Sequence, residues 1–294
     1  MRDASLGKRL DSVLPSEEST LGYLFWLSRP RFWLYLAGPV VVGVAYAADT
    51  PEELFSPLAI ALFAYFLVPA NVFLYGINDV FDADIDQINP KKDDKEVRYE
   101  GGPLVIVAVF GCAAVGLALL PFLNAAALIP LGVFYFLATE YSAPPLRFKT
   151  TPILDSISNG LYALPGIAAY GAIEGAYPPA AAIAGAWLWT MAMHTFSAIP
   201  DIEPDREAGI RTTATLLGQR RTYAYCALVW LAAAVAFALV HPFLGAVLGV
   251  YPLLVVGIAT AGVPVDRAYW WYPAINTAVG AILTMAAIWV MLYA

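Results

Sequence analysis

Charge and cysteine are scarce in this sequence. Only 13% of its 294 residues are charged, and it contains two cysteines and two histidines. Cys112 and Cys226 lie inside apolar runs, where a thiol acts as a small buried hydrophobic side chain, so we assign them no chemistry and infer no redox compartment. The absence of a Cys/His cluster also argues against a zinc site.

The N-terminal segment lacks the apolar core of a cleavable signal peptide. Residues 1–20 read MRDASLGKRLDSVLPSEEST and are mostly polar. We therefore expect residues 1–21 to form a mobile cytoplasmic tail, with membrane insertion beginning at the first span. Residues 22–294 are expected to form a single domain.

Hydrophobic residues, by contrast, make up 60% of the chain, and the mean hydropathy is +0.67. Such values are typical of integral membrane proteins. A helix needs about 20 mostly apolar residues to cross the bilayer core. The number of apolar runs of that length therefore gives the number of predicted spans. Nine runs qualify: 32–48, 55–77, 103–121, 123–141, 154–173, 178–200, 222–240, 242–262 and 270–293. The sequence thus predicts an all-α integral membrane protein with nine transmembrane helices.

The basic residues support this count and give an orientation. With nine spans, all sixteen lysines and arginines fall on one side of the membrane, in the segments 2–31, 91–98, 147–149, 206–221 and at Arg267. Short loops rich in Lys and Arg mark the cytoplasmic side, so the N-terminus is predicted to be cytoplasmic and the C-terminus outside. The net charge of −7 nevertheless makes the chain acidic, which indicates a high-salt cytoplasm or bound divalent cations.

Acidic residues cluster where two spans leave the membrane on that side. If span two continues as a helix into its loop, Asp79, Asp82 and Asp86 are spaced i, i+3, i+7 and share a face, and Asn78 adjoins them. Asp201 and Asp205 follow span six at i, i+4. The unit D-x-x-x-D therefore occurs twice, which suggests a diverged internal repeat.

Electrostatics indicates what these clusters need. Two carboxylates about 6 Å apart repel by roughly 3 kcal/mol at an effective dielectric near 20, so a cavity lined by several of them calls for a cation. Hard oxygen ligands that leave room for phosphate and water suit Mg²⁺. A solvated acidic loop is the alternative, and we prefer it for Asp84, Asp93, Asp94, Glu96 and Glu203.

A third loop on this side, YSAPPLRFKTTPILDSISNG (residues 141–160), is stiffened by paired prolines. It presents Tyr141, Arg147 and Lys149 beside Asp155 and Asn159. Cations here could hold a diphosphate whose metal the carboxylates bind, although anchoring on the cytoplasmic side also explains them. His194 lies on the same helical face as Asp201, and the sequence leaves open whether it packs or accepts a proton.

Together these motifs resemble the UbiA-type intramembrane prenyltransferases. The resemblance covers residues 22–294 and rests on N-D-x-x-D-x-x-x-D at 78–86, Y-S-x-P-P-x-R-x-K at 141–149, and D-x-x-x-D at 201–205 running into GIRTTATLLG. It implies nine helices around a central cavity, with cytoplasmic loops over the active site, and two Asp-rich motifs that bind Mg²⁺ and an isoprenyl diphosphate.

By position, the resemblance assigns the first metal site to Asn78, Asp82 and Asp86 and the second to Asp201 and Asp205. We add Asp79 as a metal ligand from the helical-face argument. Tyr141 and Lys149 match residues near the diphosphate, with Arg147, Asn159 and Arg98 as further contacts. Metal and basic side chains would stabilise the departing diphosphate while aromatic faces stabilise an allylic cation; the aromatic candidates are Phe73, Tyr75, Tyr162 and Trp189.

The segments INPKKDDKEVRYEGG and SRPRFWLYLAGPVVVG look like the branch that elongates lycopene in halophilic archaea and some bacteria. That branch implies dimethylallyl diphosphate as donor, a lycopene-like apolar acceptor, membrane lipid as the surroundings, and transfer with or without hydration. We expect no nucleic-acid partner. A quinone precursor or geranylgeranylglyceryl phosphate as acceptor remains an alternative, and a cation transporter is a more distant one.

Overall fold

Helices cover each apolar segment that was predicted to span the membrane. The structure is a computed structural model, and it describes residues 19–86 and 103–293, without the side chains of Thr20 and residues 82–86. No strand occurs in these two ranges. The α-helices are α2 (Thr20–Leu27), α3 (Trp33–Ala47), α4 (Pro51–Leu54), α5 (Pro57–Leu67), α6 (Pro69–Asp86), α7 (Pro103–Leu117), α8 (Ala125–Glu140), α9 (Leu154–Ile157), α10 (Leu164–Glu174), α11 (Ala180–Ser197), α12 (Ile202–Glu207), α13 (Thr213–Leu217), α14 (Gln219–Val240), α15 (Pro242–Leu248), α16 (Val250–Ala261), α17 (Val265–Tyr269) and α18 (Tyr272–Tyr293).

Three of the predicted spans are interrupted. Segment 55–77 is split at Val68 into α5 and α6, and segment 242–262 is split at Gly249 into α15 and α16. Segment 154–173 is a short helix α9, a 3-10 helix (Ser158–Tyr162) and then α10. The sequence did not predict the short helix α2, which packs against α6.

The break before α6 has a clear physical cause. Pro69 has no N–H to donate and disfavours helical geometry at the residue before it, so the helix ends at Leu67. Asn71, which is fully buried, donates from its side-chain nitrogen to the carbonyls of Phe66 and Leu67 at 3.0 Å each. This satisfies backbone oxygens that would otherwise be buried without a partner, so the break is a stable feature.

By length and composition, five helical segments in the described ranges can cross a membrane: 51–81, 103–122, 219–240, 242–261 and 272–293. Their outward faces carry large apolar side chains, for example Phe110, Leu239 and Trp289, which are each at least 66% exposed. Apolar surface on this scale is what a hydrocarbon environment requires and what water disfavours.

The helices pack into two apolar clusters. The first, in the N-terminal half, surrounds Leu62, Phe66 and Phe134. The second, in the C-terminal half, is rich in aromatic rings, among them Phe196 and Trp230. The helices α3 and α10 approach very closely, because a Cβ on Gly43 or Gly166 would overlap the facing backbone.

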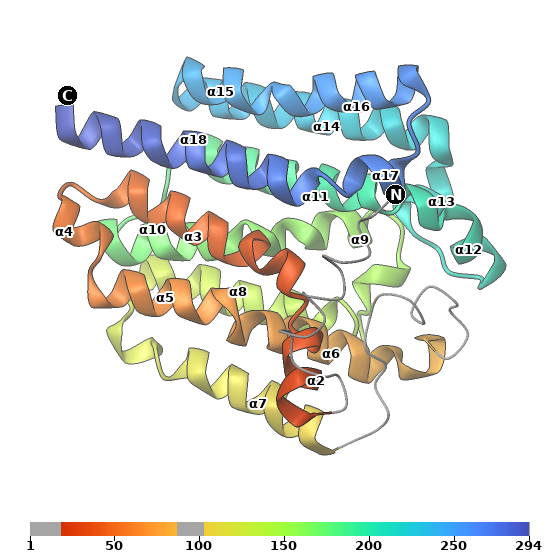
Figure 1. Cartoon of the computed structure of the whole chain (residues 1–294), viewed down its shortest axis with the longest axis horizontal. Coiled ribbons are helices and arrows are strands. Elements are labelled where there is room, and N and C mark those ends of the chain that lie inside the picture. The colour runs from red at the N-terminus through yellow and green to blue at the C-terminus, as the bar shows by residue number, and fades with distance from the viewer. Residues whose placement is uncertain (1–18, 87–102, 294) are drawn as a thin grey trace, which may run out of the picture.

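The sequence motifs gather at one end of the bundle. In Figure 1 the end of α6, α9, α12 and α13 lie together on the right, whereas α4 and the C-terminus lie on the left. We call the first of these the motif end. Since α6 is helical through Asp86, the expected helical continuation of the first motif is confirmed for the backbone.

Candidate functional site

A cavity of about 890 Å³ opens between helices of both halves of the chain. Its wall is mostly apolar and aromatic, with side chains from α3, α10, α11 and α18, which is typical of a site for a small organic ligand. Polar groups line it toward the motif end: Arg29, Asn78, Tyr141, Asn159, His194 and Asp201. Four of these six are residues that the sequence proposed for the site.

The first motif places Asn78 and Asp79 in different surroundings. Asn78 lines the cavity, and its side-chain oxygen accepts a hydrogen bond of 2.9 Å from the Ser142 hydroxyl. Asp79 is buried and forms an ion pair with Arg29, with 3.6 Å between Oδ1 and Nη2. The side chains of Asp82 and Asp86 lie outside the described part of the chain, as does the whole of Arg98.

Arg29 is a site residue that sequence reasoning missed, because a basic residue before the first span is also expected on the cytoplasmic side. Besides pairing with Asp79, its guanidinium lies over the Tyr75 ring at 4.4 Å from the centroid. Its backbone φ is +50°, in the left-handed region. The signal that could have found it is the segment SRPR, where a basic residue precedes a proline at the start of a span.

The loop after α8 is tied to α6 at two points. Besides the hydrogen bond from Ser142 to Asn78, Arg147 donates from Nη2 to the carbonyl of Phe81 at 3.0 Å. Arg147 is not among the residues that line the cavity. Burial lowers the pKa of the Lys149 ammonium to about 8, although the nearby Asp79 carboxylate opposes this shift. An anion bound beside Lys149 would favour its charged form.

Asp155 joins this loop to the loop of the second motif. Its carboxylate accepts hydrogen bonds from the backbone N–H of Thr213 at 2.9 Å and from the Thr213 hydroxyl. The same hydroxyl oxygen accepts from the N–H of Ile153 at 2.7 Å. Asn159 donates to the carbonyl of Asp155 at 2.6 Å. We call Ile153, Asp155 and Thr213 the loop clamp.

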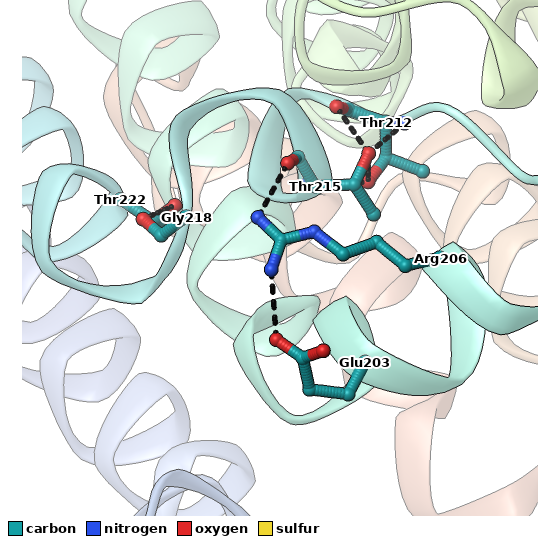
Figure 2. A network of polar contacts seen from close by, with 6 residues as sticks. All are labelled: Glu203, Arg206, Thr212, Thr215, Gly218 and Thr222. Atoms are coloured by element: carbon teal, nitrogen blue, oxygen red, sulfur yellow. Dashed lines mark hydrogen bonds and ion pairs between the residues drawn. The ribbon is translucent and has the colours of Figure 1, made fainter.

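The acidic residues of the second motif differ in their surroundings. Asp201 lines the cavity, and Asp205 is half-buried, whereas Glu203 is exposed. Figure 2 shows Glu203 accepting from Arg206 Nη1 at 2.8 Å, while Nη2 of Arg206 donates to the carbonyl of Thr215 at 3.0 Å. Arg206 thus links α12 to α13. The exposed carboxylate of Glu203 is bound to Arg206.

The oxygen donors at the motif end are chemically suitable for Mg²⁺. Asn78 and Asp201 bring an amide oxygen and a carboxylate to the same cavity, and cationic side chains stand close by at Arg29 and Lys149. Within the described side chains, no group of three His, Cys, Asp or Glu residues is close enough to hold a metal. The side chains of Asp82 and Asp86 lie outside that part, so their place as metal ligands stays a prediction.

The aromatic candidates divide between the cavity and the core. Tyr75, Tyr162 and Trp189 line the cavity. Phe73 packs edge-on against Tyr135 in the N-terminal apolar cluster, with 5.0 Å between ring centroids, and does not line the cavity. Three of the four proposed rings therefore face the space in which a substrate would lie.

Comparison with known proteins identifies the family. The model of the UbiA prenyltransferase family matches residues 36–286. The chain belongs to the UbiA prenyltransferase family. It is therefore a prenyltransferase and a multi-pass membrane protein.

Two relatives of this UbiA prenyltransferase are similar over nearly their whole length. The lycopene elongase/hydratase of Haloarcula japonica is 63% identical over 286 residues, which is 97% of each chain. That of Haloferax volcanii is 66% identical over 269 residues, 92% of this chain and 89% of the relative. The predicted resemblance to the lycopene elongase branch is confirmed.

The fold of the UbiA prenyltransferase also has solved counterparts. A UbiA homologue from Archaeoglobus fulgidus, bound to DMAPP and Mg²⁺, superposes with a TM-score of 0.66 at 22% identity, covering 89% of this chain and 99% of that one. The all-α fold predicted from the sequence is thereby confirmed.

Backbone strain concentrates at the candidate site of this prenyltransferase. Within the described residues, the non-glycine residues with positive φ are Arg29, Arg147 and Ile153. Arg147 and Ile153 lie in the segment between α8 and α9, and Arg29 lines the cavity. A β-branched residue such as Ile153 reaches this region only at a cost of about 1–3 kcal/mol, which the surrounding contacts must offset. The hydrogen bond from the Ile153 N–H to Thr213 is such a contact.

Proposed function

We propose that this chain transfers a dimethylallyl group from its diphosphate to lycopene or a related carotenoid, in a Mg²⁺-dependent reaction on the route to C50 carotenoids. The observation that carries the proposal is the high identity, over nearly the whole chain, to haloarchaeal proteins named lycopene elongase/hydratase. The structure bound to DMAPP and Mg²⁺ supports a C5 donor and a metal.

The two Asp-rich motifs are proposed to hold the metal and the donor. Asn78, Asp82 and Asp86 would provide one set of oxygen ligands, and Asp201 with Asp205 the other. When bound, Mg²⁺ neutralises the charge that develops on the leaving diphosphate. Asp79, proposed from the sequence as a further ligand, also holds the Arg29 guanidinium at the cavity wall.

Basic and polar residues of the loop after α8 are proposed to bind the diphosphate itself. Lys149 is half-buried, and a trianionic ligand would keep its ammonium charged despite the lowered pKa. Tyr141 and Asn159 line the cavity, whereas Lys149 is not among its lining residues. Arg147 and Arg98 complete the proposed set, with Arg147 also fixing the loop to α6.

The apolar part of the cavity is proposed to receive the acceptor and to protect the cation. The faces of Tyr75, Tyr162 and Trp189 can stabilise an allylic cation. An apolar polyene has no acidic hydroxyl, so its double bond attacks without a base to ionise it. In this proposal the cavity is surrounded by nine membrane-spanning helices, with the N-terminus and the motif end in the cytoplasm.

Pigment analysis tests the acceptor. Deleting the gene should make cells accumulate lycopene and lose C50 carotenoids, and a plasmid copy should reverse both changes. Unchanged carotenoids together with a loss of quinones or of archaeal ether lipids would instead identify the acceptor as a quinone precursor or as geranylgeranylglyceryl phosphate.

A further inference from the structure

One helix gives the apolar cavity a line of polar side chains. Thr190, His194 and Ser197 of α11 all line it and are spaced i, i+4 and i+7, so they share one face of the helix. Asp201, beyond the end of α11, lines the same cavity at the motif end. Polar groups in such a row can hold water against a wall that is otherwise apolar.

His194 stands in the middle of this row and faces Tyr141. Its Nε2 lies 3.4 Å from the Tyr141 hydroxyl, and the two rings meet edge to face. Its backbone carbonyl accepts from the Ser197 hydroxyl at 2.7 Å, which fixes the neighbouring turn. The imidazole and the phenol come from α11 and from the end of α8, so a water in the cavity beside this pair could bond to both groups.

Among the described residues that line the cavity, His194 is the one group suited to take a proton near neutral pH without a metal. The other ionisable groups there are tyrosines, arginines and Asp201. Phenols and guanidiniums are protonated at neutral pH, with ordinary pKa values of about 10 and above 12. Asp201 already belongs to the proposed metal site.

We propose that His194 is the general base that activates water in a hydration step following C5 transfer, with the Tyr141 hydroxyl orienting that water. This inference rests on the proposed function. When the acceptor double bond attacks the allylic cation, a new C–C bond forms and leaves a tertiary carbocation on the acceptor. Water adds through oxygen to that carbon, its O–H bond breaks, and the proton passes to Nε2 of His194, giving a tertiary alcohol.

Without His194 the same carbocation has another outcome. Loss of a proton from the adjacent carbon gives an alkene, and the released diphosphate is a base that can accept that proton. The imidazole therefore decides the ratio of hydrated to unhydrated elongated product, whereas the residues that bind the donor decide the rate of elongation. This separation gives a readout that a merely structural role of His194 would not change.

The test measures that ratio for His194→Gln in membrane vesicles with lycopene, dimethylallyl diphosphate and Mg²⁺. General bases contribute about 10²- to 10⁴-fold, so the hydrated product should fall at least about a hundredfold while unhydrated elongated product accumulates. Mass spectrometry in ¹⁸O-labelled water identifies the oxygen that is added. Imidazole supplied to vesicles containing His194→Ala should restore part of the hydrated product.

His241→Asn is the matched control, because His241 is exposed at the start of α15 and accepts from the N–H of Phe243 at 3.2 Å, which asparagine can also do. Its product ratio should equal that of the wild type. An unchanged ratio in His194→Gln, or an equal loss of both products in the folded variant, would overturn the inference while C5 transfer by the wild type stands. Absence of C5 transfer by the wild type would overturn the proposed function itself.

Discussion

Alanine at Asp201 or Asp205 is expected to lower the rate of prenyl transfer by at least about a thousandfold, because each change removes a carboxylate that stabilises charge at the leaving diphosphate. The same loss is expected for Asp82→Ala and Asp86→Ala. Each variant should still insert into the membrane at wild-type levels. The measurement is labelled C5 transfer in vesicles, together with the Mg²⁺ concentration required for half-maximal rate.

Glu203→Ala is the matched control for this set. Glu203 lies between the two aspartates in sequence, yet its side chain is exposed and bonds to Arg206. Exposed ion pairs contribute roughly 0–1 kcal/mol, so the variant should retain most of its activity. Equal loss in Glu203→Ala and in the aspartate variants would remove the distinction between a metal face and a solvated acidic surface.

Thr213→Val is expected to be the most damaging change outside the metal ligands. Valine keeps the shape of threonine but removes the hydroxyl that donates to Asp155 and accepts from the N–H of Ile153. A buried carboxylate and a part-buried N–H then lose a partner, and the loss at a fully buried group costs about 1–3 kcal/mol. We expect a thermal unfolding transition in detergent lowered by several degrees and a clearly reduced rate of transfer.

Two variants show whether the hydroxyl is responsible. Thr213→Ser keeps the hydroxyl and should retain near wild-type stability. Thr222→Val removes a hydroxyl that is equally buried, but whose partner is the carbonyl of Gly218 at 2.9 Å (Figure 2). It should be milder than Thr213→Val, since only one such bond is lost. A loss in Thr222→Val equal to that in Thr213→Val would contradict a special role of the loop clamp.

The sequence predicted the helices because their signals are local. Apolar runs of spanning length mark helices directly. The i, i+4 spacing of Asp201 and Asp205 predicted one continuous helical face, but the structure places Asp201 at the end of a 3-10 helix (Ile199–Asp201) and Asp205 within α12. The continuation of α6 through Asp86 followed from the same periodicity. The break at Val68 was also readable in principle, since Pro69 and Asn71 both stand in the segment.

Contacts between distant segments could not be predicted in this way. The pairing of Arg29 with Asp79 and of Asp155 with Thr213 joins residues 50 and 58 positions apart. No spacing rule in the sequence connects the two members of either pair. Arg29 and Ile153 have left-handed backbone conformations, which sequence patterns normally indicate by a glycine, and neither residue is one. Phe73 shows the same limit. The sequence proposed its aromatic ring for the cavity, but the ring packs in the N-terminal apolar cluster.

The most direct test of the proposed function uses purified protein in lipid vesicles with labelled dimethylallyl diphosphate and lycopene, with and without Mg²⁺. We predict that label enters the carotenoid fraction only when both lycopene and Mg²⁺ are present. Transfer that persists without divalent metal, or label that enters a quinone precursor or geranylgeranylglyceryl phosphate and never lycopene, would contradict it.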